Sequence, residues 1–230
     1  LGAALAFMAC HALVEFTFSI YCYLPMAFGV FAAISLDCGD TFPLPAWMER
    51  SAVKNGVVLG ICALLALFGV LLGCNIAAQN LVEQDASLEN LERAAALDPF
   101  EKADHMLSYV AQVTGTEPDE EIRQKAERYA ARLEKIDSNI IPYYLAAYYL
   151  DTGWTERGLE MAERYVTYVS ADAATWDQTF ALLEEYEQDT EEYRAGVLHI
   201  AARLDQWNAE NMGSIELDEQ SRAVVERMRG

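Results

Sequence analysis

Residues 142–162 read "PYYLAAYYLDTGWTERGLEMA", and their pattern is the strongest indication of how the C-terminal half of the chain folds. Apolar residues recur three and four positions apart on both sides of Gly153, which is typical of two amphipathic helices. Small residues (Ala146, Gly158 and Ala162) lie where two such helices could approach closely. The stretch therefore predicts a helical hairpin with its turn near Gly153.

The spacing of this hairpin resembles the tetratricopeptide repeat, whose period is about 34 residues. Trp176 lies one such period after Pro142 and occupies the equivalent aromatic position, and Phe180 and Leu183 follow it. Candidate ends of earlier repeats are Asp98-Pro99 and Asp137-Ser138. We expect an array of helical hairpins in this half, and an irregular helical bundle is the alternative.

No stretch from Leu88 onward alternates as a strand would. Further stretches with helical periodicity are "LERAAALDPF", "AERYAARLEKID", "AATWDQTFALLEEY", "EEYRAGVLHIAARLD" and "DEQSRAVVERMR". We expect most aromatic side chains here to pack between helices, while a few could line a concave surface for a peptide or a glycan. His105 and His199 are expected on helices without a recognisable partner, and we assign them no role.

Charge and hydrophobicity belong to different parts of the chain. The whole has a net charge of -20 and is 53% hydrophobic. Residues 1–78 hold four acids and two bases, whereas residues 79–230 hold 32 acids and 14 bases. This acidic half argues against nucleic-acid binding, which needs Lys and Arg for the phosphates. It also argues against lying flat on anionic lipid.

All five cysteines fall in the apolar part of the chain. Disulfide frameworks belong to small secreted domains, and no two cysteines have the spacing of zinc ligands. We expect them to be small buried hydrophobic residues. The sequence predicts no metal site and no bound cofactor.

Two apolar runs predict two membrane spans. Residues 57–78 carry no charge and would form a helix about 33 Å long, enough to cross a bilayer. Residues 1–34 would form a helix of about 51 Å, too long for one crossing. Pro25 interrupts that run, so we place the first span at residues 12–34.

The predicted fold class is therefore all-α, with two transmembrane helices followed by a soluble helical-hairpin domain. Residues 1–78 form the membrane part, with residues 35–56 as the loop, and residues 79–230 form the acidic helical-repeat domain. Arg50 and Lys54 place the loop on the cytoplasmic side, because basic residues favour that side. The C-terminal domain is then expected on the outer face of the cell membrane.

Within the first apolar run, "HALVEF" (residues 11–16) holds a histidine and a glutamate. His11 and Glu15 lie one helical turn apart and share a face, which Ser19 and Cys22 continue. An ionisable residue in a span is costly and indicates a functional site. The alternative is a structural pair that hydrogen-bonds to neighbouring helices.

The stretch "HALVEFTFSIYCYLPMAFGVFAAI" resembles the segment near the C-terminal end of the membrane domain in the O-antigen ligase and polymerase family. The resemblance covers roughly residues 1–34, and the order of a further span and tetratricopeptide-like repeats agrees with it in architecture. It implies transfer of a glycan from a polyprenyl-diphosphate carrier to an acceptor hydroxyl on the outer face. It also implies that His11 acts as general base and that Glu15 orients its ring.

The arginines that bind the diphosphate in this family match no residue of the sequence. We therefore expect the chain to be the C-terminal piece of a longer protein and to be inactive alone. No basic segment precedes the first apolar run, so a signal peptide fits poorly. Two other functions remain open: a non-enzymatic membrane-anchored scaffold whose repeats recruit a protein partner, and a transporter subunit with His11 and Glu15 as a proton relay.

Overall fold

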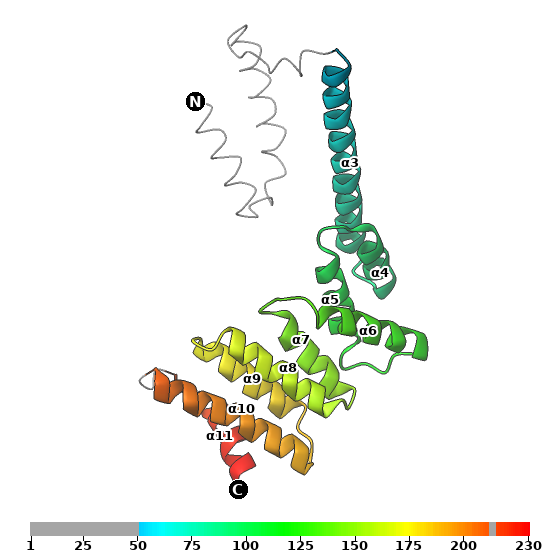
Figure 1. Cartoon of the computed structure of the whole chain (residues 1–230). Coiled ribbons are helices and arrows are strands. Elements are labelled where there is room, and N and C mark those ends of the chain that lie inside the picture. Colours follow the sequence, from blue (N-terminus) through cyan, green and yellow to red (C-terminus); the bar gives the residue numbers. More distant parts are fainter. Residues whose placement is uncertain (1–50, 212–214) are drawn as a thin grey trace. The chain divides into compact units, whose positions relative to one another are not determined.

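The computed structural model describes residues 51–211 and 215–230, and within these ranges every regular element is a helix. Figure 1 shows these helices in chain order, from α3 in blue to α11 in red. The all-α fold class is confirmed for the described residues. The predicted span at residues 12–34 lies outside them.

The first described helix, α3 (Ser51–Gln84), contains the whole predicted span at residues 57–78. Large apolar side chains point outward from it: Leu64 is 67% exposed and Val70 62% exposed. In the part of the chain that the structure describes, one segment, Ala66–Gln84, is long and apolar enough to cross a membrane. Only 11% of that segment is buried, so α3 is not the covered core helix of a globular domain.

Helix α3 does not end at the predicted domain boundary near residue 79 but continues through Gln84. Its last turns are polar, and they hydrogen-bond to the helices that follow. Contacts between residues divide the chain into two compact units, Leu1–Leu64 and Leu65–Gly230. The second unit contains the C-terminal part of α3 together with every later helix.

In the described part of the chain eight helices follow α3, and all but α5 lie at or near the positions expected from the periodicity. They are α4 (Leu88–Leu97), α5 (Lys102–Val113), α6 (Glu120–Leu133), α7 (Ile141–Asp151), α8 (Thr155–Tyr168), α9 (Ala173–Glu185), α10 (Glu191–Glu210) and α11 (Glu219–Arg229). Helix α4 ends directly before Asp98-Pro99, as the sequence predicts. Helix α5 was not predicted from the sequence.

Three helices begin at residues whose side chains cap them. Asp119 Oδ1 accepts the backbone N–H of Ile122 at 2.9 Å and so caps α6. In the same way Thr190 caps α10 and Asp218 caps α11. The free N–H groups of a first helical turn need such acceptors, which explains why these helices start where they do.

The predicted hairpin of residues 142–162 forms from α7 and α8. Gly153 has a φ of 79°, a left-handed conformation that favours glycine, and the next N–H, that of Trp154, donates to the carbonyl of Tyr149 at 2.7 Å. A Cβ at Gly158 would lie 2.6 Å from Leu150 Cγ. Glycine at position 158 therefore lets α8 approach α7 closely.

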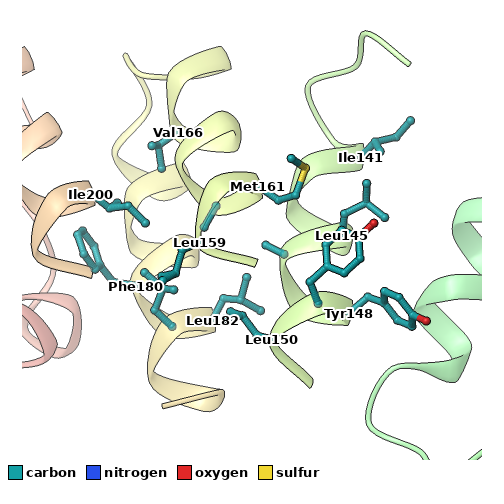
Figure 2. Close-up of a cluster of buried hydrophobic side chains, with 14 of the residues drawn as sticks. Ile141, Leu145, Tyr148, Leu150, Leu159, Met161, Val166, Phe180, Leu182 and Ile200 are labelled. Carbon is teal, nitrogen blue, oxygen red and sulfur yellow. The ribbon is translucent and has the colours of Figure 1, made fainter. Parts of the chain in front are cut away.

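Some of the later helices pack on the next helix in the chain, and others on the helix two places away. Helix α7 packs on α8 and on α5, α8 packs on α10, and α9 packs on α11. Figure 2 shows side chains from four of these helices meeting in one layer, among them Leu150, Leu159, Leu182 and Ile200. Trp176, Phe180 and Leu183 of α9 are at most 1% exposed and belong to this core.

Candidate functional site

The two residues predicted to be catalytic, His11 and Glu15, lie outside the described residues. The cluster of polar groups that the structure does bring together is at the junction of α3, α4 and α5. It is built around Asp98, whose side chain is fully covered. We call Asn75, Asp98 and His105 the buried junction.

Each carboxylate oxygen of Asp98 accepts two hydrogen bonds. Oδ1 accepts the backbone N–H groups of Phe100 at 2.8 Å and Glu101 at 3.0 Å. Oδ2 accepts Asn75 Nδ2 at 2.9 Å and is 3.1 Å from His105 Nε2. Since an ionised carboxylate can only accept, His105 Nε2 carries the proton in this contact. Asp98 therefore joins three helices through one side chain.

The local sequence explains this position of Asp98. A residue before proline avoids the helical conformation, and Asp98 is extended, with φ -80° and ψ 117°, so α4 ends there. The chain then turns, and the Asp98 carboxylate receives the N–H groups at the start of α5. His105 follows about one turn into α5, and its ring contacts Asp98.

The electrostatics of the junction favour an ionised Asp98. Burial on its own would raise the pKa of this carboxyl group. The hydrogen bonds from the Glu101 and Phe100 backbone, and then those from His105 and Asn75, outweigh burial and hold the pKa below its ordinary value. The junction is thus a buried charge with all its acceptor positions used.

Further hydrogen bonds attach the end of α3 to the same helices. Gln79 Nε2 donates to Glu101 Oε2 at 3.1 Å. Asn90 of α4 donates to the Leu81 carbonyl of α3 at 3.4 Å, and Gln112 of α5 donates to the carbonyl of Ala86, directly after α3, at 2.6 Å. Helix α3 is therefore connected to α4, to α5 and to the loop between them by several hydrogen bonds.

These groups connect α3 to α4 and α5. Among the described residues, no three His, Cys, Asp or Glu side chains are placed to hold a metal ion. His105 is only 7% exposed and its Nε2 is engaged by Asp98, so a substrate has little access to it.

A second polar feature is a small pocket beside α7 and α8. Its lining consists of Glu127, Tyr148, Tyr149, Thr152, Trp154 and Arg157. The buried Tyr148 hydroxyl has no hydrogen-bond partner in the described part of the chain. Burial raises the pKa of Tyr148 to about 12, so the phenol is neutral and can donate or accept. Such a pocket can hold a small polar group of a ligand.

The rim of this pocket is aromatic and cationic. The Arg157 guanidinium lies 4.8 Å from the ring centroid of Trp154, and Trp154 is 47% exposed. Tyr149 donates its hydroxyl to Glu134 at 2.5 Å, and this carboxylate is also 4.0 Å from Arg157. The expectation that most aromatic residues pack between helices holds for Tyr148 and Tyr149, which are nearly covered, but not for Trp154.

Sequence reasoning missed the buried junction, although signals for it exist. Asn75 is a polar residue inside an uncharged apolar run, and a buried amide needs a hydrogen-bond partner. Both histidines without an expected partner have one: His105 contacts Asp98, and His199 Nε2 is 3.3 Å from Glu163 Oε1. The second pair is exposed and lies between α8 and α10.

Comparison of the chain with protein-family models, with curated proteins and with solved structures finds no match.

Proposed function

We propose that this chain is the membrane-anchored C-terminal part of a glycan ligase or polymerase. The resemblance of "HALVEF" to the O-antigen ligase and polymerase family motivates this assignment. The structural observation that supports it best is helix α3, whose exposed apolar side chains are followed directly by an acidic all-helical domain. A span followed by a helical domain is the order that the resemblance implies.

In this proposal His11 is the general base on the outer face of the membrane. Neutral imidazole takes the proton of the acceptor hydroxyl while the oxygen of that hydroxyl forms a bond to the anomeric carbon of the glycan. The bond between that carbon and the carrier phosphate breaks, and polyprenyl diphosphate leaves with the electron pair. Glu15, one turn along the same face, orients the imidazole ring.

We further propose that α5–α6 and α7–α8 are hairpins of a tetratricopeptide-like array, which α9, α10 and α11 continue. Contacts between helices two places apart (α5 with α7, α8 with α10, α9 with α11) support such stacking. The close approach at Gly158 supports it as well. The array would bind a protein partner of the transferase.

The proposed chemistry predicts that His11→Ala in the full-length protein abolishes glycan transfer in cells. The reason is that the hydroxyl proton then has no acceptor at the reacting centre. The measurement is the amount of transferred glycan, with the membrane level of the protein determined in parallel. His199→Ala is the matched control, because His199 is an exposed histidine of the helical domain, and it should leave transfer unchanged.

Unchanged transfer in His11→Ala would contradict the catalytic role. It would favour the second candidate, a membrane-anchored scaffold without enzymatic activity. The specific observation behind this candidate is the exposed Trp154 beside Arg157, at the rim of a pocket that contains the unpaired Tyr148 hydroxyl. An aromatic side chain next to an arginine is common where one protein binds another.

A further inference from the structure

The corner between α4 and α5, residues 96–100, exposes only apolar side chains. Leu97 is 43% exposed and Phe100 44% exposed, and Ala96 and Pro99 are exposed beside them. Asp98, the one charged residue of the corner, is 2% exposed because its carboxylate points inward to the buried junction. The hydrogen bonds of Asp98 thus remove the charge from this surface.

Two hydrogen bonds fix the corner and the residue after it to a defined position along α3. Asn75 Nδ2 donates to Asp98 Oδ2 at 2.9 Å, and Gln79 donates to Glu101 at 3.1 Å. At 1.5 Å per residue, Asn75 lies about 27 Å along the helix axis from Val57, where the uncharged run begins. The hydrocarbon core of a bilayer is about 30 Å thick. A span that enters at Val57 therefore leaves the hydrocarbon close to Asn75.

We propose that the corner of residues 96–100 inserts into the boundary between lipid headgroups and acyl chains, next to the exit of α3. This inference rests on the proposed membrane span. The occupant is the bilayer itself, because the hydrogen bond between Asn75 and Asp98 holds the corner beside the end of the proposed span, where Ile76 of α3 is 49% exposed. An amphipathic segment gains by burying apolar side chains in this zone, where aromatic residues are common.

The insertion has a consequence for the helical domain. It adds an apolar contact with lipid to the hydrogen bonds that already fasten α4 and α5 to α3. Lys102 is exposed two residues after Phe100, where its flexible side chain can reach a lipid phosphate. Helices α4 and α5 are then held against the membrane surface.

The test uses fluorescent labels at four positions of similar exposure in the full-length protein. The native cysteines (Cys10, Cys22, Cys38, Cys62 and Cys74) are replaced by alanine. Single cysteines at Leu67, Leu97, Phe100 or Ile140, which are 43–55% exposed, then carry an environment-sensitive dye. The protein is reconstituted in phosphatidylcholine vesicles, and the dye is quenched either by iodide in water or by spin labels in the lipid. Circular dichroism before reconstitution selects variants that retain native helicity.

We expect labels at Leu97 and Phe100 to be quenched severalfold more by a spin label near the headgroup than by iodide, with a blue-shifted emission. The label at Leu67 should respond to a spin label deep in the acyl chains, and that at Ile140 to iodide alone. If Leu97 and Phe100 behave like Ile140 while Leu67 contacts lipid, the span stands and the insertion is wrong. If Leu67 is also quenched by iodide, the proposed span fails, and the insertion fails with it.

Discussion

Asp98→Ala is expected to lower the free energy of unfolding of the helical domain by about 3 kcal/mol, because it leaves several buried polar groups without partners. The Asn75 amide and the His105 ring each lose a hydrogen bond to the carboxylate, and so do two backbone N–H groups at the start of α5. Urea titration of the full chain in detergent micelles, followed by circular dichroism, measures the change. Asp104→Ala is the matched control, since Asp104 is an exposed aspartate in the first turn of α5, and its effect should be small.

The same variant predicts a dependence on pH. The pKa of Asp98 is lowered in the folded chain, so its ionised form binds the junction more strongly than its protonated form. This contribution is complete above the ordinary pKa of aspartate and is lost as the pH falls through the lowered pKa. The stability difference between the native chain and Asp98→Ala should therefore shrink in acid. A difference that is constant from neutral pH into acid would mean that the charge of Asp98 does not stabilise the junction.

Trp176→Ala should be the most damaging single substitution in α7–α11, with a loss of about 4 kcal/mol in the free energy of unfolding. The side chain is 1% exposed, and its Nε1–H donates to the Ser170 carbonyl at 2.9 Å. Truncation removes the apolar contacts of the ring and leaves a cavity where α9 packs against its neighbours. The midpoint of thermal unfolding, measured by circular dichroism, reports the loss.

Trp154→Ala is the control for size and chemistry. Trp154 is 47% exposed, and its ring contacts Arg157 at the surface. We expect it to cost about 1 kcal/mol or less, since an exposed cation–π pair contributes little. Equal losses for the two tryptophans would contradict the packing described for α9.

Much of the helical domain follows from the sequence alone. Apolar periodicity locates the hairpin of α7 and α8, and Asp98-Pro99 locates the end of α4, because both signals are local. Helix α5 was not predicted, although its core residues Met106, Tyr109, Val110 and Val113 recur three and four positions apart as in an amphipathic helix; no clear start signal precedes Lys102. The start of α5 depends on the Asp98 side chain, whose Oδ1 accepts the backbone N–H of Glu101, three residues later.

The buried junction depends on contacts that periodicity does not encode. Asn75 and Asp98 are 23 residues apart, and only the folded chain brings them together. For the same reason His105 has no evident partner in the sequence. The predicted catalytic pair, His11 and Glu15, rests on a resemblance and on helical spacing, and it stays a prediction because both residues lie outside the described ranges.

We propose that α3 crosses the membrane and that the helical domain lies on the outer face of the membrane. Asp189 is exposed between α9 and α10, and a cysteine placed there, in the chain without native cysteines, tests this directly. A membrane-impermeant maleimide should label it in intact cells, whereas a cysteine at Asp40 in the predicted cytoplasmic loop should react only after lysis. Labelling at Asp189 that appears only after lysis would place the domain on the inner face and contradict the account.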